Sequence, residues 1–187
     1  MHLTVLFIII GLAILFDFLN GFHDAANSIA TVVTTKVLTP LQAVIWAAFF
    51  NFVAFFIAKF IIGEFGVADT IAKIIKEDIV VAFGANPSIV VIAALSAAIT
   101  WNLLTWKLGI PSSSSHTLIG GLAGGALAAT GYNFTAINSS IILTIIAFIL
   151  VAPIIGLLAG NIIYIITLNL CRKIKPHKAD SWFKKLQ

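Results

Sequence analysis

Long apolar stretches constrain this chain more than any other feature of its sequence. A membrane-spanning helix needs about 20 mostly apolar residues to cross roughly 30 Å of hydrocarbon. Of the 187 residues, 60% are apolar and 10% are charged, whereas about a quarter of the residues in a soluble domain are charged. A chain of this length cannot hide so much apolar surface from water. The apolar segments that we expect in the membrane are residues 3–19, 41–62, 88–106, 117–130 and 141–170.

These segments predict an all-α polytopic membrane protein. The segment 141–170 is long enough to span the membrane with some tilt. The segment 117–130 is short and contains four glycines, so we expect a re-entrant or broken helix there, or a closely packed one. Between the second and third spans, residues 66–83 place apolar side chains on one helical face. That pattern predicts a helix at the membrane interface or a structured external loop.

The basic residues gather at the C-terminal end. Six of the eleven lysines and arginines lie within residues 171–187, directly after the last apolar segment. Cytoplasmic segments beside a membrane carry an excess of these residues. We therefore expect residues 1–170 to form a membrane domain and residues 171–187 to form a basic cytoplasmic tail, with the N-terminus outside. A tail in this position indicates a multi-pass protein of the cell membrane rather than a nucleic-acid-binding protein.

The first candidate site is the polar run at residues 20–28. Ionisable side chains at membrane depth are costly, and they generally face a cavity, a pathway or a partner. The residues that share one helical face and whose oxygens suit a coupling cation are Asn20, Asp24, Asn27 and Ser28. His23 is a candidate proton carrier because histidine titrates near neutral pH in water. We expect Gly21 to let the helix unwind; the alternative is that these residues only hold helices together.

The second candidate site is the run at residues 109–117, which contains four consecutive serines. Pro111 ends the preceding helix, and serine is a strong N-cap for the next one. The first turn of that helix offers free backbone N–H groups and the positive end of the helix dipole, which favour an anion. Secondary transporters aim such broken helices at anionic substrates. The alternative is an ordinary polar loop at the membrane surface. Together the two runs predict cation-coupled anion transport.

Other classes of function fit less well. The Gly-x-Ser-x-Gly element of serine hydrolases and the phosphate-binding loop of ATPases are both missing from the sequence, so we expect neither an enzyme nor an ATP-driven pump. The single cysteine and four scattered histidines exclude a disulfide framework and a zinc cluster. A membrane interaction or regulatory subunit, and an ion channel, stay open as alternatives.

At its two polar runs the chain resembles the PiT family of inorganic phosphate transporters. The first signature of that family is Gly-x-Asn-Asp-x-Ala-Asn-Ser/Ala, which residues 21–28 match with His23 in place of the first asparagine. The second is Pro-x-Ser-Thr-Thr-His-x-x-x-Gly-Gly, which residues 111–121 match with serines in place of the threonines. The resemblance extends from about Leu12 to Leu170.

The resemblance implies a symporter that carries phosphate with Na⁺ or H⁺ and uses no other cofactor. It also implies two inverted repeats around a central site, so that the fold is one repeat of an inverted-repeat transporter. By this resemblance, the residues expected to hold phosphate are Ser113, Ser114, Ser115, Thr117 and Asn27.

Members of the family carry two copies of the acidic signature, and this chain carries one. We therefore expect the chain to supply one half of the transport site in the lipid membrane. Its partner would be a second transporter half or a second copy of the chain. The substrate would be inorganic phosphate, either free or as a metal–phosphate complex.

Overall fold

A computed structural model describes residues 3–63, 66–172 and 174–186. Helices account for nearly all of this part, and it contains no strand. The elements, in chain order, are α1 (Leu3–Thr34), α2 (Pro40–Ile57), the π-helical turn η1 (Ala58–Ile62), α3 (Gly66–Ala72), α4 (Glu77–Ala82), α5 (Pro87–Leu108), α6 (Ser114–Ala129), the 3₁₀ turn η2 (Phe134–Ala136), α7 (Ser139–Cys171) and α8 (Pro176–Leu186).

Helix lengths confirm an all-α polytopic membrane protein. Within the described residues, α1, α2 with η1, α5 and α7 are long and apolar enough to cross a membrane. Their side chains are largely exposed in the isolated chain, α5 excepted, which is the reverse of a water-soluble fold. α6 has 16 residues and is shorter than a full span.

The first helix differs from the expectation. The segment 3–19 is only its first half, because α1 continues through the polar run as far as Thr34. Gly21, where we expected an unwound turn, lies inside this continuous helix. A glycine within a helix costs about 1 kcal/mol, which is less than the cost of exposing unpaired backbone groups to lipid.

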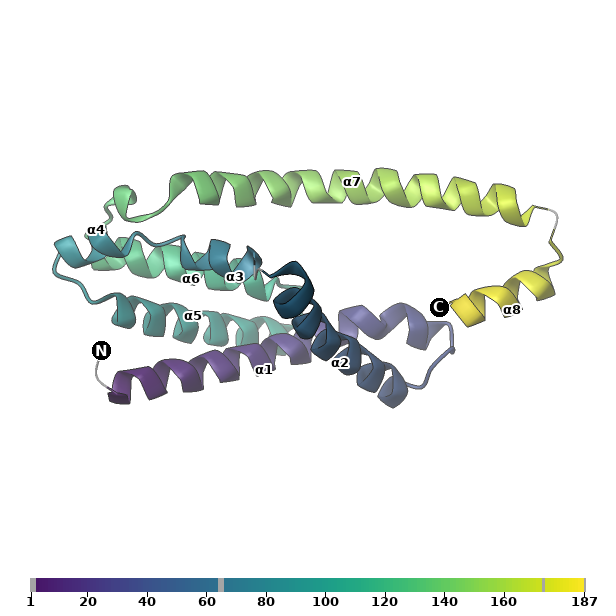
Figure 1. The fold of residues 1–187 in the computed structure, drawn as a ribbon, viewed down its shortest axis with the longest axis horizontal. Coiled ribbons are helices and arrows are strands. Elements are labelled where there is room, and N and C mark those ends of the chain that lie inside the picture. The colour runs from purple at the N-terminus through teal and green to yellow at the C-terminus, as the bar shows by residue number, and fades with distance from the viewer. Residues whose placement is uncertain (1–2, 64–65, 173, 187) are drawn as a thin grey trace.

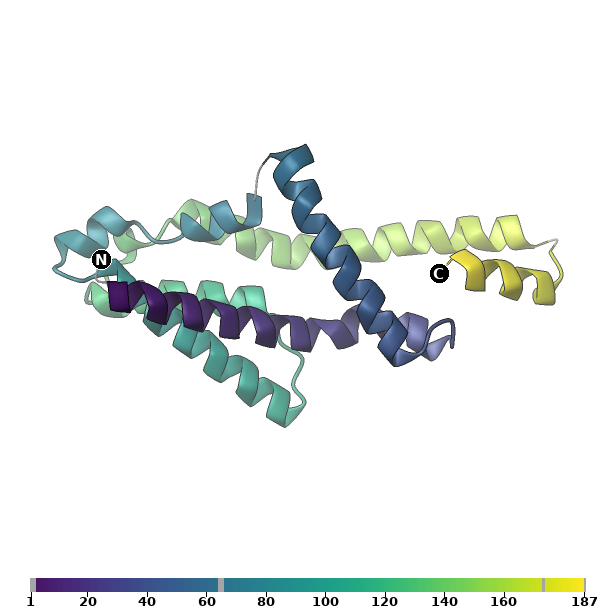
Figure 2. The ribbon, with the colours of Figure 1, turned by 60° about the horizontal axis from the view of Figure 1, so that its bottom comes forward.

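α5 and α6 form an antiparallel helical hairpin, and α1 packs along α5 (Figure 1). The hairpin is tight because small residues line the contact: an added Cβ at Gly121 would lie 2.7 Å from the Ala94 carbonyl oxygen. Figure 2 shows α2 crossing α1 near the C-terminal end of α1. α7 runs along the same long direction but makes few contacts with the other helices. The hairpin and α1 therefore form the packed part of the molecule.

The loop between the second and third spans is structured. It contains α3 and α4, and Val80 of α4 is buried with Val90, Ala126 and Ala136 against one end of the hairpin. Backbone hydrogen bonds join this loop to the segment before α7, from the Lys76 N–H to the Ala136 carbonyl oxygen at 2.9 Å. These contacts hold the end of the hairpin that is opposite the serine run.

Candidate functional site

The serine run lies at the break between α5 and α6. α5 ends at Leu108, and the φ of +65° at its C-cap Gly109 is a left-handed conformation that suits glycine. α6 begins after the N-cap Ser113, whose hydroxyl oxygen accepts a hydrogen bond from the His116 N–H. Pro111 and the first serines therefore separate two helices, as the sequence predicts.

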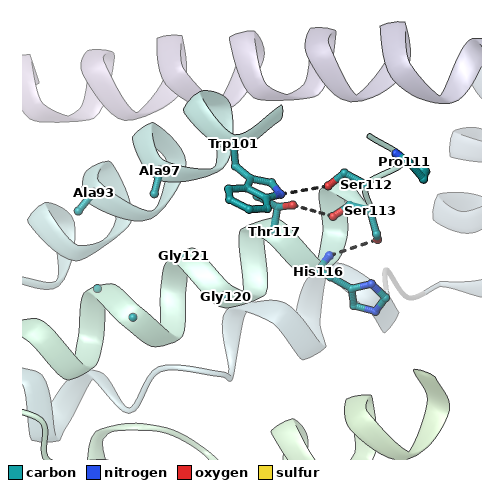
Figure 3. A pocket seen from close by; sticks show the side chains of 12 residues that line it. Ala93, Ala97, Trp101, Pro111, Ser112, Ser113, His116, Thr117, Gly120 and Gly121 are labelled. Atoms are coloured by element: carbon teal, nitrogen blue, oxygen red, sulfur yellow. Dashed lines mark hydrogen bonds between the residues drawn. The ribbon is translucent and has the colours of Figure 1, made fainter. Parts of the chain in front are cut away.

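A pocket of about 770 Å³ opens on one face of the hairpin beside this break (Figure 3). Its floor consists of small residues of α5 and α6, including Ala97 and Gly120. Its polar end is made by Trp101 and the start of α6: the Trp101 Nε1–H donates to Ser112 Oγ at 3.2 Å. The Thr117 hydroxyl donates to the Ser113 carbonyl oxygen at 2.8 Å. Hydroxyls and an indole therefore line the pocket where α6 begins.

The serines point in different directions. Ser113 lines this pocket together with Thr117. Ser114 is 8% exposed, and its hydroxyl donates to Asn20 Oδ1 of α1. Ser115 lines a second, more apolar pocket toward α7. Successive residues on a helix are about 100° apart, so the three side chains face different surroundings in this chain.

The polar run of α1 is only partly covered. Asn20 is half-buried against α6 through its contact with Ser114. Asp24 and Asn27 are exposed, and they follow Asn20 along one face of the helix. The Ser28 hydroxyl donates within α1, to the carbonyl oxygens of Asp24 at 3.1 Å and Ala25 at 3.0 Å. The expected cation ligands thus share a face of α1, and of these Asn20 is hydrogen-bonded to the serine run.

His23 lies one turn beyond Asn20. Its Nδ1 is 3.1 Å from the Leu19 carbonyl oxygen, and a carbonyl only accepts, so we assign the proton of the neutral ring to Nδ1. Its Nε2 is buried and has no partner in the described part of the chain. The neighbouring Phe22 ring packs edge-on against Trp106 of α5, with 5.7 Å between centroids.

Three residues of this region were not among the predicted site residues. Trp101 and Ser112 meet only because the break lets α6 fold back on α5, which no local pattern shows. Asn102 is 2% exposed, and its Nδ2 has no hydrogen-bond partner among the described residues. It stands in a mostly apolar span, and an amide side chain at membrane depth is a signal that could have found it.

Comparison with known proteins agrees with these two motifs. The model of the phosphate transporter family matches residues 20–186. A probable low-affinity inorganic phosphate transporter of Bacillus subtilis is 45% identical over 185 residues, covering 99% of this chain and 52% of the relative. One from Rhizobium meliloti is 47% identical over 96% of this chain and 50% of the relative. One from Streptomyces halstedii is 38% identical over 100% of this chain and 82% of the relative.

This chain spans about half the length of the first two relatives. No solved structure matches it. The names of the relatives describe transporters and not enzymes, in line with the expectation from the sequence. The family match covers the polar run of α1, the serine run and every helix after them, and on that ground the chain belongs to the phosphate transporter family.

Proposed function

We propose that this chain takes part in cation-coupled transport of inorganic phosphate across the membrane and supplies one half of the transport site. One observation carries the proposal: the Ser114 hydroxyl donates to Asn20 Oδ1. This hydrogen bond joins the two polar runs, although its residues lie 94 positions apart in the chain. The acidic run and the anion-binding run therefore belong to one region of the molecule.

The pocket beside the serine run has the chemistry of an anion site. The start of α6 offers backbone N–H groups and the positive end of the helix dipole. Ser113 and Thr117 add hydroxyl groups at the same place. No lysine or arginine is among the described residues that line the pocket. A phosphate at membrane depth therefore needs a cation from elsewhere to offset its charge.

The face of α1 next to this region supports a coupling cation. The Asp24 carboxylate and the Asn27 amide follow Asn20 on that face, and oxygen ligands of this kind suit Na⁺. His23 offers a route for H⁺ instead. We propose that either ion enters with phosphate, free or bound to a metal.

The exposed side of the site supports the half-site role. Asp24 and Asn27 are exposed in this chain, and the chain spans about half of the first two relatives. We propose that a second half, or a second copy of the chain, covers this face. By the positive-inside rule, the N-terminus would lie outside the cell membrane and the basic tail in the cytoplasm.

Labelled-phosphate uptake into proteoliposomes tests the proposal. The chain is reconstituted alone and together with the part of the Bacillus subtilis relative that it does not match, with and without Na⁺ and H⁺ gradients. We expect gradient-driven, saturable uptake only with the second half present, and loss of uptake in Ser114→Ala. Ser140→Ala, an exposed serine at the start of α7, is the matched control and should retain uptake.

Phosphate-dependent stability gives a second readout on the chain alone. A ligand at 100 times its Kd stabilises a protein by about 2.7 kcal/mol, so millimolar phosphate should raise the unfolding temperature of the wild-type chain. Uptake by the chain alone would overturn the half-site role. Phosphate-dependent conductance without saturation would indicate a channel. No uptake and no stabilisation would favour a regulatory subunit and would refute the proposal.

A further inference from the structure

Two buried nitrogen atoms in the described part of the chain have no hydrogen-bond partner: His23 Nε2 and Asn102 Nδ2. Buried polar atoms are almost always paired with protein or ordered water, and an unpaired one is costly. Asn102 is 2% exposed, so bulk water does not solvate its amide. Each atom therefore requires a partner within the packed part of the molecule.

The two atoms have opposite requirements. The Nδ1–H of His23 donates to the Leu19 carbonyl oxygen, which leaves Nε2 with a lone pair that needs a donor. The Nδ2 of Asn102 is an amide NH₂ group, which needs an acceptor. His23 Nε2 is thus the acceptor that the Asn102 amide lacks, and the Asn102 amide is the donor that Nε2 lacks.

The helix register brings the two residues to within about one turn of each other. Trp101, the neighbour of Asn102, bonds to Ser112, and Ser114 bonds to Asn20 of α1. The rings of Phe22, one residue before His23, and Trp106, four residues after Asn102, pack together.

The turn of α1 that contains His23 therefore lies against the turn of α5 that begins at Asn102. His23 shares a helical face with Asn20, three residues before it. This face is the one directed at α5 and α6, because the Asn20 side chain contacts Ser114. Asn102 is buried on α5 between that helix and its neighbours.

We propose that Asn102 is a positioning residue for His23: its amide donates a hydrogen bond to His23 Nε2 through one buried water, or directly once a side chain changes rotamer, because the two atoms do not bond to each other in this arrangement. A single water fits the same chemistry, because it accepts from the amide and donates to the ring. Either link holds the imidazole with its lone pair toward α5. Any role of this link in phosphate transport rests on the proposed function, whereas the link itself does not.

Nitrogen NMR of the full-length chain in lipid nanodiscs tests the link without measuring transport. The histidine rings are labelled with ¹⁵N, and the His23 signals are identified by their loss in His23→Gln. In the wild-type chain we expect the proton on Nδ1 and the resonance of a hydrogen-bonded Nε2. A cross-peak from this ring to water would indicate the bridged form, and a cross-peak to the asparagine amide would indicate the direct form.

Substitutions at position 102 provide the second measurement. Asn102→Leu removes the donor, so the Nε2 resonance should move to the position of an unbonded nitrogen. Asn102→Asp replaces the donor with an acceptor, so the proton should move onto Nε2. Thr105→Val is the matched control: Thr105 is also 2% exposed, but its hydroxyl already bonds to carbonyl oxygens of its own helix.

The inference is overturned if Nε2 is already unbonded in the wild-type chain, or if its resonance is the same in wild type and Asn102→Asp. The wild-type spectrum decides the question even if Asn102→Leu does not fold. A chain that transports no phosphate can still show the link, and a working transporter can lack it, so the two proposals fail separately.

Discussion

Gly121 lies at a close approach between α5 and α6. A Cβ at this position would lie 2.7 Å from the carbonyl oxygen of Ala94, 3.2 Å from its Cα and 3.3 Å from its carbonyl carbon. All three are backbone atoms, which cannot rotate away as a side chain can. Ordinary contact begins at 3.4 Å, so Gly121→Ala must push the two helices apart by several tenths of an ångström. Overpacking of this kind costs about 1–3 kcal/mol.

Gly120→Ala is the matched control. The two glycines are adjacent on α6, but an added Cβ at Gly120 meets nothing within 4 Å. Both substitutions gain the better helix propensity of alanine, about 1 kcal/mol, so this gain cancels in the comparison. Gly125→Ala should fall between them, because its Cβ would meet the Val90 side chain at 3.2 Å, and a side chain can shift.

Thermal unfolding of the three variants in one detergent, followed by circular dichroism, measures the difference. We expect the midpoint to rank Gly120→Ala above Gly125→Ala, and Gly125→Ala above Gly121→Ala. Each kcal/mol corresponds to about 2–4 °C for a soluble chain of this size, so the outer two should differ by several degrees. Equal midpoints for Gly121→Ala and Gly120→Ala would refute the conclusion that the hairpin is closely packed at this position.

Three further predictions concern single contacts. Trp101→Phe removes the indole donor to Ser112, and we expect a loss of about 0.5–1.5 kcal/mol of stability together with faster hydrogen exchange at the start of α6, measured by mass spectrometry. Asn86→Ala removes the N-cap of α5, whose side-chain oxygen accepts a backbone N–H at 2.9 Å, and the unfolding midpoint should fall by the equivalent of about 1 kcal/mol. Lys184→Ala breaks an exposed ion pair with Asp180 at 2.9 Å, so the free energy of unfolding should change by less than about 1 kcal/mol. A larger decrease in this free energy would contradict the view that the pair is well solvated.

The bounds of two long helices lie close to those of apolar segments expected from the sequence. The segment expected at 88–106 is α5 (Pro87–Leu108), and the segment expected at 141–170 is α7 (Ser139–Cys171). α5 begins with a side-chain cap at Asn86 followed by proline, and α7 begins after Asn138, a residue type that is common at helix starts although its side chain makes no cap hydrogen bond here. Run length and these start signals are local properties, so one sequence is enough to find them.

The end of the first helix could not be predicted in the same way. Hydropathy falls after Leu19, yet α1 continues to Thr34. Hydropathy reports where a helix meets lipid, whereas the helix ends where its backbone hydrogen bonds end. Polar residues such as Asn20 and Asp24 are compatible with either a helix or a loop, and packing against α5 and α6 favours the helix.

Some features of the candidate site depend on local sequence, and others depend on contacts between segments that are far apart in the chain. The sequence by itself identifies a membrane protein, the two polar runs, the break at Pro111 and the family, because each depends on residue type and spacing. Only the tertiary structure decides that Ser113 faces a pocket while Ser114 contacts Asn20. That choice depends on how closely α5 and α6 approach at Gly121 and on where α1 lies against them, and these distances are set by packing between segments far apart in the chain.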